Sequence, residues 1–320
     1  MLKRMSIRKI MVASLSLVAL FLIYLMPSNK SYDYPIKTES VEYIYTNTLN
    51  TLYLMDSNGY IARTSIKGNE GEIIDIARDV LNALIIGGNR SDIIPNGFRA
   101  IIPSGTEILD IKLDKDILIV DLSKEILSIN TIYEEKMIES IIYSLTSIKD
   151  INKIKLKVEG IVLDKLPNSG KSLPEILDRS YGINKNYNLV NTSDIDSYTI
   201  YYVSKIEDNS YYVPITKYVN NKGKDKIKII IEELSTSPIY EDNLMSFLNS
   251  DVSLIDYELE SDILNLNFSD SIFIDKGSSD ILEEVIYTIG LSFQDSLNVK
   301  DVSLLVENKE IYENLLKMLE

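Results

Sequence analysis

The sequence contains no cysteine, no histidine and no tryptophan. Without cysteine, the chain forms no disulfide, has no thiol nucleophile and offers no residue for the acylated anchor of a bacterial lipoprotein. Without histidine, it lacks the commonest general base and the commonest transition-metal ligand. These absences exclude Ser-His-Asp hydrolases, cysteine peptidases and zinc sites built from histidine or cysteine.

Positive charge is also scarce. The chain has 33 Lys and Arg residues against 48 Asp and Glu residues, so its net charge at pH 7 is −15. Four of the basic residues, Lys3, Arg4, Arg8 and Lys9, lie in the first 26 residues, which contain no acid. The rest of the chain is therefore more acidic still, and it repels phosphate backbones. This charge predicts no nucleic-acid partner and favours protein partners, basic ones in particular.

An apolar run over residues 10–26 comes after the basic N-terminus and is interrupted only by Ser14 and Ser16. A membrane-spanning helix needs about 17–25 residues, so this run reaches the required length. Basic residues before the run favour a cytoplasmic N-terminus and an extracytoplasmic location for the residues after the run. The sequence therefore predicts a single-pass cell-membrane anchor with its cytoplasmic tip over 1–26, and then a tether over 27–48.

A cleaved signal peptide is the alternative for this segment. Signal peptides end in a cleavage site of small residues, of the Ala-x-Ala kind. Residues 25–29 read Leu-Met-Pro-Ser-Asn and contain no such site. They favour an uncleaved anchor, and cleavage stays open as the alternative.

Residues 51–160 alternate between strand and helix patterns, as expected of one α+β domain. Short β-rich segments with turn residues between them are predicted strands, and stripes of apolar residues with helical spacing are predicted helices. The predicted elements are, in chain order, strands 51–55 and 60–66, a helix over 72–86, strands 106–113 and 116–122, a helix beginning near 131, and a strand over 154–158.

The second of these helices has a predicted start and a predicted buried face. Thr131 and Glu134 have the spacing of a capping box, in which each side chain satisfies a backbone N–H of the first turn. The inward face is predicted to consist of Ile138, Ile141, Ile142 and Leu145.

The same order of elements recurs from about 199 to 308. Matched positions are 144 to 152 residues apart through five blocks, the pattern of one duplication with small loop changes. In the clearest block, residues 262–269 (Asp-Ile-Leu-Asn-Leu-Asn-Phe-Ser) match residues 116–123 (Asp-Ile-Leu-Ile-Val-Asp-Leu-Ser). The segment 226–234 is rich in β-branched isoleucine, yet its apolar residues have helical spacing and the repeat requires a helix there. We therefore predict a helix.

These patterns predict an α+β protein with an N-terminal transmembrane helix and two tandem ββαββαβ domains. Between the repeats, a Pro-, Gly- and Asn-containing segment is too long for a simple turn, and apolar residues over 173–177 indicate a packed connector. The predicted boundaries are 49–165 for the first domain, 166–197 for the connector, 198–312 for the second domain and 313–320 for a C-terminal helical tail.

Two short motifs have a chemical interpretation that the surrounding sequence opposes. Residues 170–172 (Gly-Lys-Ser) end like a phosphate-binding loop, but Lys165 stands where that loop needs a glycine. Ser123 and Lys124 could form a Ser-Lys pair, but adjacent residues at a strand end point apart. We expect Ser123 to cap the next turn of the chain instead.

Acidic residues gather at the two hairpins. Such carboxylates could bind Ca²⁺ or serve a glycosidase, but on alternating strands they usually form the solvated face. We therefore predict no enzyme activity and no catalytic, cofactor-binding or metal-binding residues. The acidic residues in question are Asp114, Asp116, Asp121, Glu258, Glu260 and Asp262.

An ordered set of short motifs resembles the repeat of the GerM family of sporulation and spore-germination proteins. No single motif is specific to the family, but the order of the motifs over roughly 45–165 and 198–310 is specific to it. The resemblance implies structural roles for the family-motif residues Pro103, Gly105, Thr106, Asp121, Leu122 and Ser123. The motifs are Leu52-Tyr53-Leu54, the helix end before Gly87-Gly88, Ile102-Pro103-Ser104-Gly105-Thr106, Val120-Asp121-Leu122-Ser123 and Tyr143-Ser144-Leu145-Thr146.

Membership implies repeats similar to ring-building modules, which are αββαβ units that associate side by side. It implies a scaffold of the envelope around a developing spore, with most of the chain between the mother-cell and forespore membranes. The implied partners are other sporulation envelope proteins, with self-association into an oligomer or ring. The alternative function is an extracytoplasmic module that binds peptidoglycan or another envelope ligand.

The sequence departs from the family pattern in two respects. It has no cysteine for the lipid anchor that relatives can carry. In the second repeat, Asn-Phe-Ser at 267–269 replaces Asp-Leu-Ser, and Asn-Ser-Asp at 249–251 replaces Pro-Ser-Gly. The second departure speaks against equal roles for the two repeats.

Overall fold

A computed structural model of the chain describes residues 49–318 apart from 69–70, 208, 222, 237–242, 276 and 278. These residues belong to one compact unit that contains both repeats. The predicted anchor and tether, 1–26 and 27–48, lie outside the described residues. Within the described part of the chain, no helix is both long and apolar enough to cross a membrane.

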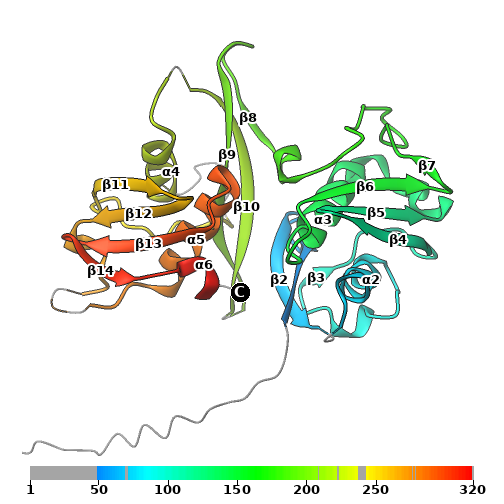
Figure 1. The fold of residues 1–320 in the computed structure, drawn as a ribbon, viewed down its shortest axis with the longest axis horizontal. Coiled ribbons are helices and arrows are strands. Elements are labelled where there is room, and N and C mark those ends of the chain that lie inside the picture. Colours follow the sequence, from blue (N-terminus) through cyan, green and yellow to red (C-terminus); the bar gives the residue numbers. More distant parts are fainter. Residues whose placement is uncertain are drawn as a thin grey trace, which may run out of the picture. The chain divides into compact units, whose positions relative to one another are not determined.

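The first repeat has the predicted order of strands and helices, with two short strands, β3 and β7, in addition (Figure 1). Its first helix ends two residues earlier than predicted, because Ile85 leaves the helix and forms a parallel bridge with Ile102. The elements are β1 (Leu49–Asp56), β2 (Ile61–Lys67), α2 (Ile73–Leu84), β3 (Phe98–Arg99), β4 (Ile108–Asp114), β5 (Ile117–Leu122), α3 (Glu134–Leu145), β6 (Lys153–Val158) and β7 (Ile161–Val162).

The second repeat has the same order. A short strand of the connector, β8 (Asn186–Asn188), precedes it, and α6 lies in the tail that was predicted to be helical. The elements are β9 (Ile195–Ile206), β10 (Asn209–Asn220), α4 (Lys226–Leu234), β11 (Leu254–Glu260), β12 (Ile263–Phe268), α5 (Glu283–Leu297), β13 (Asp301–Val306), β14 (Lys309–Tyr312) and α6 (Leu315–Met318).

Helix α4 confirms the prediction for the isoleucine-rich segment. The Asp225 carboxylate accepts hydrogen bonds from the backbone N–H groups of Ile227 at 3.0 Å and Lys228 at 3.4 Å. This cap satisfies donors that the first turn leaves unpaired. The residues with helical spacing are also the buried ones, so burial of one face and the cap outweigh the β-propensity of isoleucine. The buried residues are Ile227, Ile230, Ile231 and Leu234.

Each repeat contains a four-stranded sheet with the same topology. The strand orders are β4-β5-β6-β7 in the first repeat and β11-β12-β13-β14 in the second. The two central strands are parallel in each sheet, β5 with β6 and β12 with β13, and the outer pairs are antiparallel. A parallel pair needs a crossover connection, and α3 and α5 provide it.

The N-terminal hairpins of the two repeats join in a single sheet. Its order is β3-β1-β2-β10-β8, with β9 on the other edge of β10. Strand β2 meets β10 in an antiparallel pairing at Arg63 and Tyr212. The repeats are therefore not two independent domains on a connector, because a shared sheet runs from one into the other.

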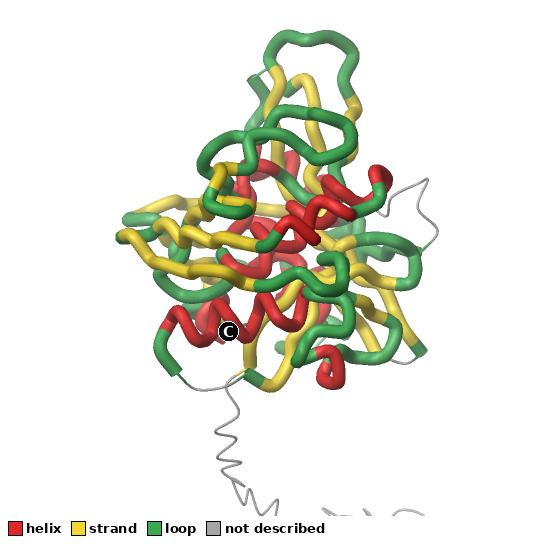
Figure 2. The backbone as a smooth tube through the Cα atoms, turned by 90° about the vertical axis from the view of Figure 1, so that its right-hand side faces the viewer, coloured by secondary structure: helices red, strands yellow, loops and turns green. Residues whose placement is uncertain are grey.

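Helix α3 packs against both the shared sheet and the four-stranded sheet of its repeat, and α5 does the same in the second repeat. Figure 2 shows helices lying among the strands. In α3 this enclosure buries more than the predicted stripe, since Tyr143 and the hydroxyls of Ser140 and Ser144 are buried too. The predicted inward residues Ile138, Ile141, Ile142 and Leu145 are all fully buried.

The capping box predicted at Thr131 and Glu134 is wrong. Helix α3 begins at Glu134, and the preceding 3₁₀ turn is capped by the Asn130 side chain, which accepts from the Ile132 N–H at 3.1 Å. The Glu134 carboxylate accepts instead from the backbone N–H groups of residues 168 and 169 in the connector, at 2.9 and 3.0 Å. The Glu134 carboxylate therefore binds backbone groups distant in the sequence instead of the backbone of its own helix turn.

Candidate functional site

Two equivalent tyrosines mark the place where the repeats meet. Tyr53 on β1 and Tyr201 on β9 are both buried, and their hydroxyl oxygens are 2.8 Å apart, at hydrogen-bond distance. The two residues occupy matching positions in the repeat. The same position of each repeat therefore contributes a tyrosine to the junction.

Helix serines hold the backbone of both strands beside these tyrosines. The Tyr53 N–H donates to Ser144 Oγ at 2.8 Å, and Ser140 Oγ donates to the Tyr53 carbonyl at 2.6 Å. In the second repeat, the Tyr201 N–H donates to Ser292 Oγ at 2.9 Å. These hydroxyls pair with backbone groups that a neighbouring strand would otherwise bind, so the buried N–H and C=O groups stay hydrogen-bonded.

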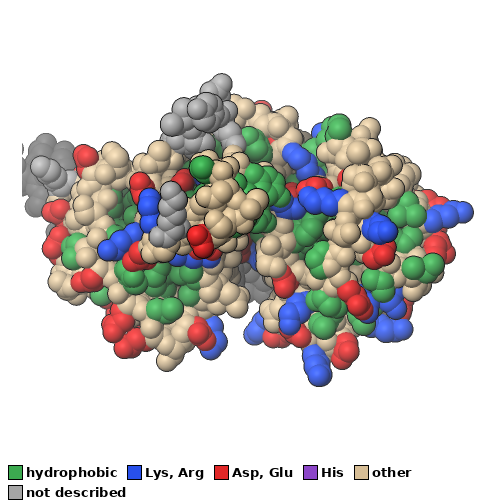
Figure 3. Space-filling model, turned by 90° about the horizontal axis from the view of Figure 1, so that it is seen from above, with side chains coloured by type: hydrophobic (Ala, Val, Ile, Leu, Met, Phe, Trp, Pro, Cys, Tyr) green, Lys and Arg blue, Asp and Glu red, His purple; other side chains and the backbone are tan. Residues whose placement is uncertain are grey.

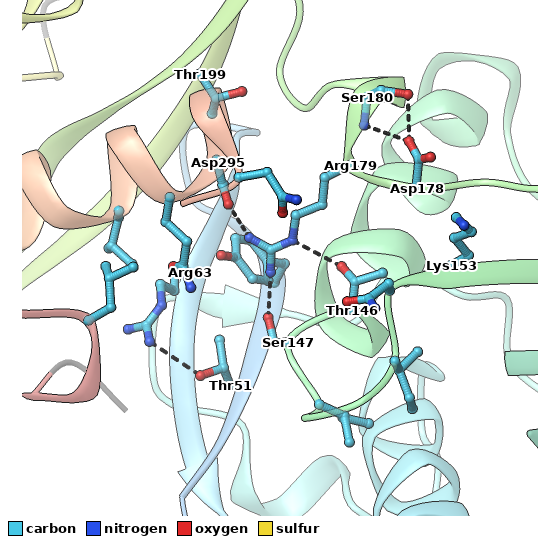
Figure 4. Close-up of a pocket in the computed structure, with 18 of the residues that line it drawn as sticks. Thr51, Arg63, Thr146, Ser147, Lys153, Asp178, Arg179, Ser180, Thr199 and Asp295 are labelled. Atoms are coloured by element: carbon cyan, nitrogen blue, oxygen red, sulfur yellow. Dashed lines mark hydrogen bonds and ion pairs between the residues drawn. The ribbon is translucent and has the colours of Figure 1, made fainter. Parts of the chain in front are cut away.

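Arg179, from the connector, contacts both repeats at this junction (Figure 4). Its guanidinium forms an ion pair with Asp295 on α5. It also donates to Thr146 Oγ1 at 3.0 Å and to Ser147 Oγ at 2.8 Å, at the end of α3. The Tyr143 ring lies 4.9 Å from the guanidinium carbon. One side chain thus joins the connector to the last turns of both central helices.

The polar network around Asp295 has one charge of each sign. The Tyr201 hydroxyl donates to Asp295 Oδ2 at 2.6 Å. Burial, and after it the Asp295 carboxylate, raises the pKa of Tyr201 well above its usual value, so the phenol stays protonated and donates. Burial by itself lowers the pKa of Arg179, but Asp295 keeps that pKa above its usual value. Arg179 therefore stays protonated beside the Asp295 carboxylate.

A cleft of about 1200 Å³ opens beside the junction. Both repeats and the connector line it, with Thr51, Arg63 and Thr199 on strands of the shared sheet and Ser180 on the connector (Figure 4). Lys153 on its wall forms an ion pair with Asp116 at 3.4 Å. Over the described ranges, no group of three or more acidic residues is placed to hold a metal ion.

The comparisons with known proteins agree with this arrangement. The family model described as "Sporulation and spore germination" matches residues 51–164 and 199–312. The spore germination protein GerM of Bacillus subtilis (strain 168) is 33% identical over 277 residues, which cover 85% of this chain and 75% of that protein. The chain belongs to the GerM family.

A solved structure of this family has the same tandem arrangement. The tandem GerMN domains of the sporulation protein GerM from Bacillus subtilis superpose with a TM-score of 0.74 at 33% identity, covering 82% of this chain and 92% of that one. The chain is thus a GerM-like sporulation and germination protein with two tandem GerMN domains of the α+β class, as the motifs predicted.

The GerM-family motif over 103–106 forms a turn. Thr106 Oγ1 donates to the Pro103 carbonyl at 2.8 Å, and the Thr106 N–H donates to the same oxygen at 3.3 Å. Gly105 has φ of +79°, which glycine adopts without strain. These residues do not line the cleft.

Ser123 occupies the N-cap position of the next 3₁₀ turn, but the side-chain cap predicted for it is wrong. Its side chain does not cap the next turn. It accepts instead from the Glu107 N–H at 2.9 Å and so fastens β5 to the start of β4. In the second repeat, Ser269 Oγ accepts from the Ser253 N–H at 3.1 Å in the same way. The hydroxyl therefore serves the sheet in both copies.

Asp121 and Leu122 also have counterparts with the same function. Asp121 Oδ1 accepts from the Gly160 N–H at 3.0 Å, and Asn267 Oδ1 accepts from the Asn308 N–H at 3.0 Å. Leu122 and Phe268 are both buried. The change from Asp-Leu-Ser to Asn-Phe-Ser thus preserves each contact, and this departure does not distinguish the roles of the repeats.

The connector supplies two junction residues, Arg179 and Asn184, that local sequence patterns do not reveal. Asn184 Oδ1 accepts from the Ile61 N–H at 2.9 Å. Its Nδ2 donates to the carbonyls of Ile61 at 2.7 Å and Pro214 at 2.8 Å, so one amide bridges β2 and β10. Arg179 and Asn184 both lie in the connector segment 177–184, which the family model does not cover. The apolar residues Leu173 and Leu177 are buried, as predicted.

Proposed function

We propose that this chain is a non-enzymatic scaffold of the sporulation and germination envelope. It acts through protein–protein assembly, in the space between the mother-cell and forespore membranes. Membership of the GerM family, and the sporulation and germination roles in the names of its relatives, support this proposal. Other envelope proteins are the proposed partners, and assembly of copies into an oligomer is part of the same proposal.

The joint between the repeats is the observation that carries the proposal. Strand pairing between β2 and β10, the Asn184 bridge and the Arg179–Asp295 ion pair connect the repeats without a free linker. Two small modules held in this way present their surfaces at a fixed spacing, which a scaffold requires. A pair of modules on a flexible tether would not maintain that spacing.

The cleft at the junction favours the alternative, a module that binds peptidoglycan or another envelope ligand. Its hydroxyl and amide groups suit a glycan, and domain junctions are common places for ligand sites. Sedimentation of the full chain with purified peptidoglycan separates the two functions. Binding that is lost on changing Lys153 to Ser favours the ligand-binding module, whereas absence of binding favours the scaffold.

The proposed anchor has a direct test. We expect the full-length chain in the membrane fraction of sporulating cells, with residues 30–320 digested by protease added from outside. The physical reason is the basic flank before the apolar run, which keeps the N-terminus in the cytoplasm. A soluble form that begins near residue 28 would show cleavage and overturn the anchor.

Single polar changes at the motif residues are expected to leave sporulation within a few-fold of wild type. Asp121→Asn keeps the acceptor, as Asn267 shows, and Asp262→Asn changes an exposed turn. Ser123→Ala removes one hydrogen bond, which costs about 1–3 kcal/mol, and leaves the fold in place. A sporulation assay measures the effect, and circular dichroism checks folding. A hundredfold loss in a folded variant points to a reaction centre and contradicts the scaffold.

A further inference from the structure

Strand β11 is the outer strand of the second repeat's sheet. Within the described residues, it pairs only with β12, so its other edge presents unpaired backbone groups. All of its residues after Leu254 are exposed. They include large apolar side chains, with Ile255 47% exposed and Leu259 54% exposed. Long exposed edges with apolar side chains are unusual, because they pair readily with other strands.

The equivalent strand of the first repeat, β4, is covered at its centre, although Leu109, which matches Ile255, is also 47% exposed. Helix α2 packs on β4, and Ile111 at its centre is 6% exposed. The matching residue of β11, Tyr257, is 36% exposed. Helix α4 has 9 residues where α2 has 12. Among the described residues, the first repeat therefore packs a helix against its outer strand, whereas α4 reaches β11 through its N-cap residue Asp225, which accepts from the Tyr257 hydroxyl at 2.7 Å.

The two strands also differ in charge, and β11 is the more acidic. In β4, Lys112 stands between two acids and forms an ion pair with Asp110 at 2.7 Å. In β11 the corresponding positions are all acidic, Asp256, Glu258 and Glu260, on the face opposite Tyr257 and Leu259. Among the described residues, no ion pair reaches these three carboxylates.

The whole second repeat shares this excess of negative charge. Residues 198–312 contain 21 acidic and 9 basic residues, whereas residues 49–165 contain 18 and 14. Figure 3 shows Asp and Glu side chains along the outer margin of this repeat. The potential at the β11 edge therefore attracts basic segments.

We propose that β11 binds an extended segment of a partner protein in which apolar residues alternate with Lys or Arg. The segment adds a fifth strand to the sheet, and its backbone pairs with the open edge. Its apolar side chains lie beside Tyr257 and Leu259, and its cations lie beside Asp256, Glu258 and Glu260. This inference rests on the proposed function in one respect, namely that the chain acts through protein partners.

A second copy of β11 is a poor occupant of this edge. Pairing two such strands places the acidic rows on one face, and like charges opposite one another destabilise a sheet. A basic alternating strand avoids that repulsion and gains an ion pair at every second residue. The acidic row therefore selects a heterologous partner.

The test uses the full chain and a ten-residue peptide of alternating Val and Lys. We expect the peptide to bind and to slow hydrogen exchange in residues 254–260. Glu258→Lys should weaken binding by about tenfold, because it replaces an attraction with a repulsion. The matched control is Glu310→Lys on β14, an exposed acid on the opposite edge of the same sheet, which should change binding by less than about twofold.

Two results overturn strand docking. Equal weakening by both substitutions means that the peptide senses only net charge, and protection confined to the cleft at the junction places the site elsewhere. Either result leaves the scaffold proposal standing, because that proposal rests on the joint between the repeats. Specific protection of β11 supports strand docking. If, in addition, folded variants altered at the joint between the repeats sporulate normally, the result counts against the scaffold.

Discussion

Replacing Arg179 with Met is expected to lower the free energy of unfolding by about 3–5 kcal/mol. The change keeps much of the side chain's apolar stem but removes the cation beside Asp295, whose side chain is 1% exposed. A buried carboxylate without a partner costs more than the pair itself contributes, because the carboxylate stays desolvated. Urea unfolding of the full chain, monitored by circular dichroism, measures the difference.

Two further variants isolate the cause. Arg179→Met combined with Asp295→Leu removes both charges, and we expect it to recover most of the lost stability. Lys155→Met breaks an ion pair with Glu175, a largely exposed residue, and should cost no more than about 1 kcal/mol. If Arg179→Met alone unfolds within about 1 kcal/mol of wild type, the ion pair does not hold the repeats together.

Replacing Ile142 with Asp is expected to unfold the first repeat. Ile142 is fully buried on α3, the helix enclosed between the shared sheet and the four-stranded sheet. An unpaired charge there costs several kcal/mol, a large part of the roughly 5–15 kcal/mol by which a typical domain is stable. Because β2 pairs with β10, the loss of structure should extend into the second repeat.

Thermal unfolding and the helical circular dichroism signal measure this effect. The control is Ile132→Asp, near the start of the same helix, where the side chain is 69% exposed. A surface change of this kind should move the melting temperature by less than about 2 °C. An Ile142→Asp variant that melts like wild type would show that this face of α3 is not buried.

Local patterns predicted most of the elements. The duplication resolved the one ambiguous segment, since the isoleucines of α4 favour a strand and the repeat requires a helix. The turn at Pro103 and Gly105 uses residue types that set φ directly. Predictions that depended on a single local hydrogen bond did not hold. Glu134 and Ser123 both find partners outside their own turn.

The sequence by itself determined the secondary structure, the duplication and the family, because apolar spacing, turn residues and internal repetition are properties of neighbouring positions. Only the tertiary structure decided how the repeats are joined. Arg179 and Asp295 are 116 residues apart in the chain, and Asn184 reaches a strand 123 residues earlier. Such contacts leave no periodic signal. The exposure of an outer strand such as β11 also depends on the tertiary structure, because it is set by how a helix packs against the strand.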